Sequence, residues 1–483
     1  MNRQQLLALL PILFSSATVV WVMTAIAIKR HHWWNATFSV IGLNLALIGC
    51  VVAYFVSPQI VTPLLIVDSY SCLYMAMVLA TGLATATLSH AYMEGYDGNK
   101  EEVYLLLNLS VLGGLVLVCA RHFASFFIGL ELLSVPLYGL IGYLVKERRS
   151  LEASMKYLVL SAAASAFILF GMALIYSQTG ALAFSDIGTR VAAISGSGSG
   201  YTVMVVGGAM ILVGIGFKLS LAPFHLWTPD VYEGAPAPVA AYLATASKVA
   251  VFAVLLRFFI EAKAYNYELL LDVLTALAIV SIVLGNLLAL LQDNLKRLLA
   301  YSSIAHFGYL LVAFIAAGQF ATEAVGVYLL TYVVTTLAAF GVVTLMSSPY
   351  KNHDADTLWD YRGLFWRRPY LSTILTIALL SLAGIPMTAG FIGKFYAITA
   401  GVEKRQWLLL GAVVFGSAVG LYYYLRAMVQ LYLRAPWVRR YSAPLAWAQG
   451  TGGAMVVALA VLMLVLGIYP QPFIAAIQAA GLH

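Results

Sequence analysis

The stretch 216–238, GFKLSLAPFHLWTPDVYEGAPAP, decides the fold of this chain. An apolar run that carries Lys218 meets Pro223, which lacks a backbone N–H and clashes with the preceding helical turn, so we expect the helix to break there. In a membrane, irregular backbone is tolerated only where it is buried in protein or lines a wet cavity, and such breaks mark transport sites. An ordinary helix end at the cytoplasmic surface is the alternative interpretation.

The composition around this stretch is that of a membrane protein. Of the 483 residues, 62% are hydrophobic and only 10% are charged, and the mean hydropathy is +0.91; soluble domains carry about 25% charged residues. A span needs roughly 20 apolar residues to cross about 30 Å of hydrocarbon, and we therefore expect an all-α polytopic fold of about fourteen transmembrane helices. The predicted spans are 5–28, 37–56, 71–92, 103–120, 123–145, 153–177, 202–222, 237–260, 269–291, 298–317, 324–347, 370–399, 407–433 and 452–470.

Basic residues are distributed unequally between the two sets of connections. One set holds fifteen of them: Lys29, Arg30, Lys100, Lys146, Arg148, Arg149, Lys296, Arg297, Lys351, Arg362, Arg367, Arg368, Arg434, Arg439 and Arg440. The other set, with the N-terminus, holds six: Arg3, Arg121, Arg190, Lys263, Lys404 and Arg405. The positive-inside rule then places both termini on the outer, periplasmic side of a bacterial inner membrane. Because the charges are scattered over short loops without interleaved aromatic residues, we expect no nucleic-acid binding.

A second break resembles the first. The run 381–386, SLAGIP, repeats the Ser220 to Pro223 pattern at an offset of 161 residues, and Lys394 follows it. The two spans are five apart, so they cross in opposite directions, as two inverted five-helix repeats require. We expect one membrane domain, 1–483, made of three N-terminal helices in 1–100, a first antiporter-like repeat in 101–260, an inverted repeat in 268–433 and a C-terminal helix in 434–483. Discontinuous helices are expected near Pro223 and Pro386.

Five ionisable side chains lie within the apolar spans: Glu131, Lys156, Lys218, Lys248 and Lys394. Each charge near the centre of a membrane helix costs roughly 2.5 to 3.5 kcal/mol, so the set calls for a functional explanation. By position along their spans, Glu131 and Lys248 should lie near the bilayer midplane, whereas Lys156 is about a turn inside its helix and could reach the headgroups. Arg257 and Arg426 are interpreted as anchors with buried stems.

These groups fit the transport of protons. Burial disfavours the charged form of lysine and glutamate, and a nearby opposite charge restores it, so a lysine beside Glu131 would hold or release a proton as the carboxylate approaches or withdraws. His225 and His306, the two histidines near membrane depth, could pass protons between sites. Sodium ions prefer oxygen ligands, which four lysines do not supply. A set of structural ion pairs that hold helices together is the alternative interpretation.

Redox centres are not expected in this chain. Cys50, Cys72 and Cys119 fall singly in three spans, so neither an iron–sulfur centre nor a zinc site can be built from them, and two histidines are few for a haem. The chain has no G-x-G-x-x-G after a strand and no P-loop. We therefore expect no cofactor and no metal to be bound by this chain.

Several long blocks resemble one family, the antiporter-like membrane subunits of the proton-pumping NADH:quinone oxidoreductase, respiratory complex I. The blocks are GLELLSVPLYGLIGY around Glu131, RRSLEASMKYLVLSAAASAF around Lys156, GFKLSLAPFHLWTPDVYEGAPAPVAAYLATASK, NLKRLLAYSSIAHFGYLL with His306, and LLSLAGIPMTAGFIGKFY with Lys394. The resemblance implies that Glu131 pairs with Lys218 in one half-channel, that Lys248 is the central relay, that Lys394 serves a second half-channel, and that Lys156 is an accessory site.

The resemblance also implies partners. A second antiporter-like chain, small helical subunits and membrane lipid would surround this chain, while NADH, FMN, iron–sulfur clusters and quinone would lie in partner subunits; alone it would not be catalytic. Because the chain ends about ten residues after Pro472, we expect it to lack the long lateral helix of one sister subunit. The residue type at the position of Lys394 can differ in that sister subunit and in its neighbour, so the lysine here fits the remaining branch of the family. Three spans before the first repeat indicate a bacterial chain. A subunit of an Mrp-type sodium/proton antiporter is the main alternative, and a membrane redox enzyme with its own haem or flavin is another.

Overall fold

The computed structural model describes residues 2–193, 198–316, 319–347, 354–434 and 450–481. Within them, twelve helices are long and apolar enough to cross a membrane, counting 237–261 as one, and two shorter apolar helices complete a set of fourteen. The predicted fold class, an all-helical polytopic membrane protein, is confirmed. Of the basic residues behind the predicted orientation, Lys351, Arg439 and Arg440 lie outside the described residues.

The helices follow the predicted spans closely, and one small hairpin separates the third helix from the fourth. The strands β1 (Gln59–Thr62) and β2 (Leu65–Val67) pair antiparallel. The helices are α1 (Arg3–Ala8), α2 (Leu10–Ile28), α3 (His32–Val56), α4 (Ser69–Glu94), α5 (Glu102–Val118), α6 (Phe123–Ile141), α7 (Arg148–Thr179), α8 (Phe184–Ala193), α9 (Ser199–Leu219), α10 (Trp227–Gly234), α11 (Ala237–Ala244), α12 (Ala246–Glu261), the 3-10 helix η1 (Ala264–Asn266), α13 (Glu268–Leu290), α14 (Leu295–Ile315), α15 (Gln319–Met346), α16 (Leu364–Arg367), α17 (Pro369–Ala383), α18 (Ala389–Glu403), α19 (Trp407–Tyr432), α20 (Thr451–Ile468) and α21 (Gln471–Ala479).

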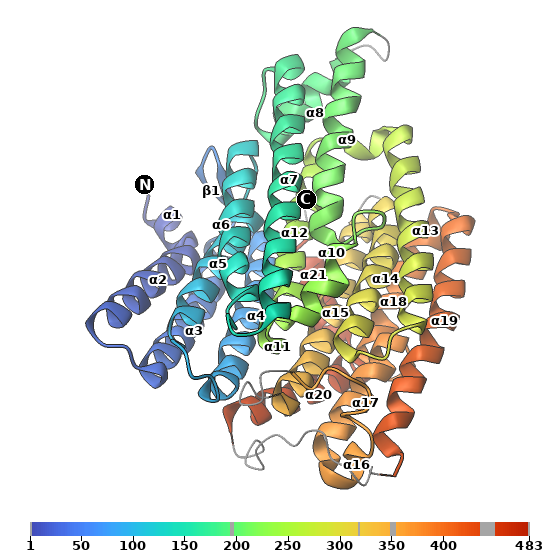
Figure 1. Cartoon of the computed structure of the whole chain (residues 1–483). Helices are drawn as coiled ribbons and strands as arrows, with labels where there is room; N and C mark the ends of the chain where they lie inside the picture. Colours follow the sequence, from blue (N-terminus) through green and yellow to red (C-terminus); the bar gives the residue numbers. More distant parts are fainter. Residues whose placement is uncertain (1, 194–197, 317–318, 348–353, 435–449, 482–483) are drawn as a thin grey trace.

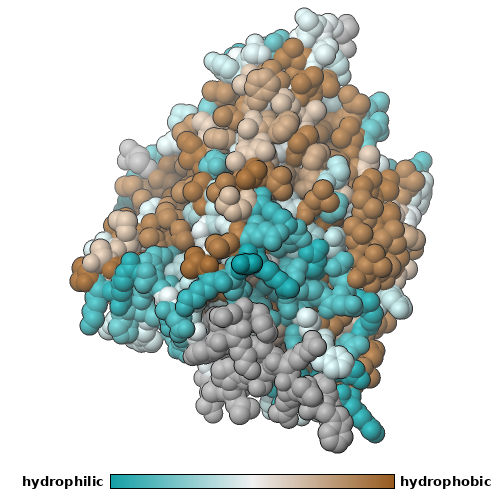
Figure 2. Space-filling view, in the orientation of Figure 1, coloured by the Kyte–Doolittle hydropathy of each residue, from teal (hydrophilic) through white to brown (hydrophobic). Residues whose placement is uncertain are grey.

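The long helices lie side by side, with α2 and α3 at one edge and α13 and α19 at the other (Figure 1). The central α12 and α14 are buried along nearly their whole length, whereas α2 buries few of its residues. Large apolar side chains on the outer helices are exposed, among them Phe55, Leu408 and Val414. Figure 2 shows hydrophobic residues covering much of the visible face, with hydrophilic residues gathered in its lower half. Such a surface fits a lipid environment.

Both predicted breaks are present. Helix α9 ends at Leu219, where Ser220 adopts a left-handed conformation with φ of 63°, and α10 begins only at Trp227. Helix α17 ends before Gly384, which has φ of 83°, and α18 resumes at Ala389. A left-handed residue satisfies the last carbonyls of a helix and turns the chain away from it.

A third break was not predicted. The expected continuous span 237–260 is divided at Thr245, whose φ of −120° and ψ of −83° end α11 and begin α12. The side chain of Thr245 donates a hydrogen bond to the carbonyl of Ala241 at 2.6 Å, which competes with the helical pattern. The predicted span 237–260 is confirmed as one span, Ala237–Glu261, but the interruption at Thr245 was not predicted, because no proline or glycine marks this position.

Helices α5 and α6 are in backbone contact. A Cβ added at Gly113 would lie 2.2 Å from the backbone nitrogen of Leu133, and one added at Gly129 would lie 2.7 Å from that of Leu117. Any larger side chain at either position would force the two helices apart. Glu131 lies on α6 between these contacts, so its backbone is fixed against α5.

Arg257 on α12 is an interhelical anchor, as predicted. Its guanidinium donates two hydrogen bonds of 2.8 Å to the carboxylate of Asp68, just before α4, and one of 3.0 Å to Ser71. Burial alone would raise the pKa of the Asp68 carboxyl, but the charge and hydrogen bonds of Arg257 outweigh burial and hold that pKa below its usual value. The charge of this buried cation is therefore paired with that of a carboxylate.

Candidate functional site

Lys218 lies at the last turn of α9, where its ammonium is enclosed by hydroxyl groups. Its Nζ donates to Ser134 Oγ on α6 at 2.7 Å and to Ser161 Oγ on α7 at 2.8 Å. The side chain is buried, with an exposed fraction of 5%. The first break places this lysine, because the chain leaves the helix two residues later.

Glu131 reaches the same group of hydroxyls from the other side. Its Oε1 accepts a hydrogen bond from Ser165 Oγ at 2.5 Å. Ser165 lies one turn from Ser161 on α7, and Ser134 lies one turn from Glu131 on α6. Glu131 and Lys218 thus lie against the same group of serines, Glu131 bonding to Ser165 and Lys218 to Ser134 and Ser161, without a direct ion pair between them.

Lys248 lies in the first turn of α12, just after the unpredicted break. Its Nζ donates to Ser303 Oγ on α14 at 2.8 Å and lies 4.7 Å from the centre of the Phe307 ring. Ser303 Oγ is 2.6 Å from the hydroxyl of Tyr332 on α15, which donates to the carbonyl of Ala244 at 3.2 Å. Since Ala244 ends α11, the break frees the carbonyl that completes this chain of hydroxyls.

His306 lies one turn beyond Ser303 on α14. Its Nδ1 is 2.8 Å from the hydroxyl of Tyr328, and its Nε2 is 3.3 Å from that of Tyr424 on α19. A cavity of about 10 Å³, room for about one water molecule, is lined by His306 and Tyr332, together with Ser381 near the end of α17. The residues that line this cavity all come from the second repeat, on α14, α15, α17 and α18.

Lys394 on α18 folds back over the second break. Its Nζ donates to the carbonyl of Ala383, the last residue of α17, at 2.8 Å, and lies 5.2 Å from the centre of the Tyr309 ring. A Cβ added at Gly384 would lie 2.7 Å from Lys394 Cδ, so glycine serves both the left-handed turn and the passage of this side chain.

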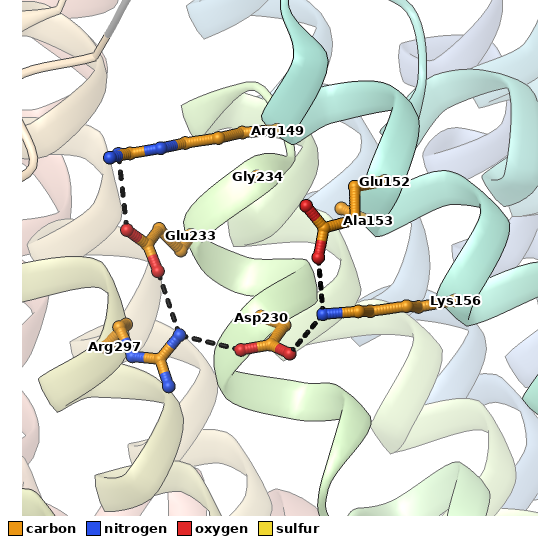
Figure 3. A pocket seen from close by; sticks show the side chains of 8 residues that line it. All are labelled: Arg149, Glu152, Ala153, Lys156, Asp230, Glu233, Gly234 and Arg297. Atoms are coloured by element: carbon orange, nitrogen blue, oxygen red, sulfur yellow. Dashed lines mark hydrogen bonds and ion pairs between the residues drawn. The ribbon is translucent and has the colours of Figure 1, made fainter.

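Lys156 is placed elsewhere, in a surface pocket of about 230 Å³ (Figure 3). Its Nζ pairs with Glu152 at 2.7 Å and with Asp230 on α10 at 2.8 Å. Arg297 pairs with Asp230 at 2.7 Å and with Glu233 at 2.9 Å. The side chain of Lys156 is 41% exposed and lies in the charged lining of this pocket, away from the buried group around Lys218.

Asp230 is the centre of this charged cluster. Burial by itself would raise the pKa of its carboxyl, but the hydrogen bonds and charges of Lys156 and Arg297 outweigh burial and hold that pKa below its usual value. The cluster ties α10, the short helix after the first break, to α7 and α14. Sequence reasoning singled out Lys156 but not its partners, because they belong to separate connections.

His225 lies in the turn between α9 and α10. It is buried, and its Nδ1 has no hydrogen-bond partner among the described residues; the same holds for the buried hydroxyls of Ser220 and Thr228. Three unpaired polar atoms in one turn are typical of a site that holds water.

The sequence reasoning missed the hydroxyl groups that join the charges. Ser134, Ser161, Ser165, Ser303 and Tyr332 carry no charge and are common in membrane helices, so their types alone indicate nothing. The available signal was helical spacing, because Ser134 follows Glu131 by three residues and Ser303 precedes His306 by three.

Comparison with known proteins then identifies the family. The family described as NADH:quinone oxidoreductase/Mrp antiporter, membrane-spanning region, matches residues 120–420. The NADH-quinone oxidoreductase subunit N of Ectopseudomonas mendocina (strain ymp) is 58% identical over 487 residues, which cover 100% of this chain and 97% of that protein. The chain belongs to the subunit N family. It is a proton-translocating membrane subunit of NADH:quinone oxidoreductase, respiratory complex I, as the sequence resemblance implied.

Solved structures agree with this assignment. A chain of respiratory complex I from Thermus thermophilus with bound aureothin is 34% identical, with a TM-score of 0.82 over 98% of this chain and 100% of that one. A chain of the archaeal membrane-bound sulfane sulfur reductase is 25% identical, with a TM-score of 0.86 over 99% and 97%. A chain of the Mrp complex from Dietzia sp. DQ12-45-1b has a TM-score of 0.82 over 99% and 97% at 19% identity, a likeness of fold alone.

Proposed function

We propose that this subunit of complex I moves protons along a row of buried groups that runs from Glu131 and Lys218 through Lys248 and His306 to Lys394. One observation carries the proposal. The three lysines are buried, and the hydrogen-bond acceptors of their Nζ atoms are neutral: serine hydroxyls for Lys218 and Lys248, and a backbone carbonyl for Lys394.

The structural cations of the same protein are arranged differently. Arg257 holds the carboxylate of Asp68, and buried Lys296 holds that of Asp354 at 2.6 Å. A buried charge without an opposite partner is costly, so three lysines in neutral surroundings are poor structural elements. These three lysines suit the uptake and release of protons, because a neutral hydroxyl or carbonyl can accept a hydrogen bond from the charged or the neutral form of the amine. This contrast argues against structural ion pairs as the reason for the set.

Hydroxyl groups give the row its continuity. A proton on Lys248 passes to Ser303 Oγ, which gives its own proton to the hydroxyl of Tyr332, and this hydroxyl releases one to water in the cavity beside His306. After the transfer each hydroxyl is neutral again, and its O–H bond rotates back before it passes the next proton. On the first side, Ser161 bonds to Lys218 and Ser165, one helical turn away, bonds to Glu131, and a proton would pass between these two serines. His225, beside the first break, would admit protons through water, and Lys156 would be accessory.

Two inverted repeats, 101–260 and 268–433, would each supply one half-channel. Both breaks begin with a left-handed residue, Ser220 in the first and Gly384 in the second. The lysine precedes the break on α9 but follows it on α18.

The remaining parts of the pump would lie in partner subunits. NADH, FMN, iron–sulfur clusters and quinone would be bound there, and a second antiporter-like chain and small helical subunits would flank this one. The subunit would span the bacterial inner membrane with both termini periplasmic, with residues 1–100 and 434–483 flanking the repeats.

Substitution of Lys248 in the assembled complex tests the proposal. Lys248→Ala should abolish or sharply reduce proton pumping and coupled quinone reduction, and Lys218→Arg should do the same, because arginine keeps its proton near neutral pH. Lys404→Ala, at an exposed lysine beyond α18, is the matched control. Pumping at the wild-type level by a fully assembled Lys248→Ala complex would favour a purely structural role.

A further inference from the structure

An apolar pocket of about 340 Å³ lies between α9 and α13, with α8 and η1 at its outer end. This volume is within the range of roughly 300 to 1,000 Å³ found for ligand sites. Among the described residues, its lining contains no charged side chain. The pocket is separate from the buried lysines and from the charged cluster around Asp230.

The pocket has the depth of one membrane leaflet. On α9 its lining runs from Tyr201 to Val213, a rise of about 18 Å at 1.5 Å per residue. On α13 it runs from near the start of the helix to Leu277. The hydrocarbon core is about 30 Å thick, so the pocket extends from one interface to about the midplane. The interface is the one on which Arg190 and Lys263 lie.

The mouth of the pocket is suited to a phospholipid headgroup. Tyr201 and Tyr267 lie there, within electrostatic reach of each other, and tyrosine is enriched where chains and headgroups meet. Lys263, which is exposed, lies between the lining residues Ala262 and Ala264. Its ammonium complements the phosphate that every phospholipid carries.

We propose that this pocket binds one acyl chain of a phospholipid from the outer leaflet, with the phosphate beside Lys263. The apolar lining, the leaflet depth and the charge at the mouth each fit this ligand. In a bilayer, an apolar void between helices gains contacts when a flexible chain fills it, since packing replaces the hydrophobic effect as the driving force there.

The deep end of the pocket touches the first break. Phe224, which follows Pro223, lines the pocket, and its ring packs so closely on α9 that a Cβ added at Gly216 would lie 2.7 Å from it. Lys218 is two residues from Gly216. A bound chain would therefore press on Phe224 and stabilise the turn that places this lysine. This last step rests on the proposed function, whereas the binding itself does not.

A photoreactive lipid tests the binding. The whole complex, reconstituted in vesicles of phosphatidylglycerol and phosphatidylethanolamine with a trace of phosphatidylglycerol bearing a diazirine at its acyl end, should be labelled on α9 and α13 at the pocket. Gly208→Phe should lose this labelling, because Gly208 lines the pocket and an added Cβ there meets nothing within 4 Å. Gly411→Phe on α19, where an added Cβ also meets open space, should not.

The outcomes separate the possible occupants. Labelling that avoids the pocket in the wild type, or that is unchanged in Gly208→Phe, would overturn the proposal, as would label on a helix of a partner subunit cross-linked to these residues. Gly208→Leu serves the same purpose if the larger variant does not assemble. A Lys248→Ala complex should be labelled like the wild type, so failure of the pumping proposal and failure of lipid binding remain distinguishable.

Discussion

The buried cations of this protein form two groups, which differ in whether their hydrogen-bond partners are charged or neutral. Arg257 and Lys296 are held by carboxylates, whereas Lys218, Lys248 and Lys394 are held by hydroxyls or a carbonyl. The residue types at membrane depth could be predicted from the sequence, since a charge in an apolar span is visible there. The partners could not, because serine and tyrosine are ordinary in such spans and only the fold brings Ser303 to Lys248.

The hydroxyl of Tyr332 should matter for turnover. Tyr332→Phe removes one oxygen and interrupts the bridge from Ser303 to the cavity, so we expect proton-coupled turnover to fall about tenfold, which corresponds to about 1.4 kcal/mol of barrier. Tyr242→Phe is the matched control, because the buried hydroxyl of Tyr242 has no partner among the described residues. Steady-state quinone reduction and proton uptake in vesicles measure both. Equal losses in the two variants would show an effect of packing rather than of proton transfer.

Asp68 should matter for stability instead. Asp68→Asn leaves the buried guanidinium of Arg257 with only the longer 3.4 Å pair to Glu261, so we expect a loss of up to about 3 to 5 kcal/mol. Because the pKa of Asp68 is lowered in the folded protein, its contribution is complete at neutral pH and is lost only as the pH falls through that lowered value, below about 4. Thermal unfolding of the purified complex should show the loss in the variant and no pH dependence from this group between pH 5 and 8.

Among the helices, those with a proline or glycine at the break were predictable and the other was not. The turns after α9 and α17 follow from Pro223 and Gly384, whose backbone preferences are strong. The turn at Thr245 depends on a side chain that bonds to its own helix and on Tyr332, which takes up the freed carbonyl of Ala244. Such a break depends on tertiary contacts and has no local signature.

The short helix α10 is held by charges at the surface, and their loss should be mild. Asp230→Asn removes a partner of Lys156 and Arg297, but Lys156 keeps Glu152 and Arg297 keeps Glu233. Exposed ion pairs contribute about 0.2 to 1 kcal/mol each to stability, so we expect α10 to keep its place and turnover to stay near the wild-type rate. Since the pKa of Asp230 is lowered, it stays ionised between pH 5 and 8, and the pH profile of turnover should keep its shape. A complete loss of pumping would instead place Asp230 in the proton path.

At the scale of the whole molecule, the connections fall into two sets, as the charge pattern requires. Arg149, Glu233, Arg297 and Asp356, from four alternate connections, belong to one network of ion pairs and hydrogen bonds with Asn294. In the opposite set, the backbone of His122 pairs with that of Ala183. Counting the spans predicts that successive connections lie on opposite sides of the membrane. It does not predict which residues of different connections contact one another.

Reporter fusions should reveal the orientation of the chain in the membrane. A fusion after Ala479 or in the connection at Lys263 should report the periplasm, and one at Lys146 should report the cytoplasm, because the basic connections remain inside. A phosphatase reporter that is active in the periplasm and a fluorescent reporter that is active in the cytoplasm, fused at the same positions, give a positive signal for either location. A cytoplasmic signal after Ala479 would mean that one broken span does not cross the membrane.

The contact between α5 and α6 has a mechanical consequence. Gly113 and Gly129 let the two backbones touch, so α6 cannot slide or tilt without opening that seam. Glu131 is thus mounted on the stationary part of the pump. A change in its separation from Lys218 would then come from rotation of either side chain or from movement of the end of α9. In this half-channel the backbone that carries the acidic group is therefore fixed, and the backbone that carries the lysine is the one that can move.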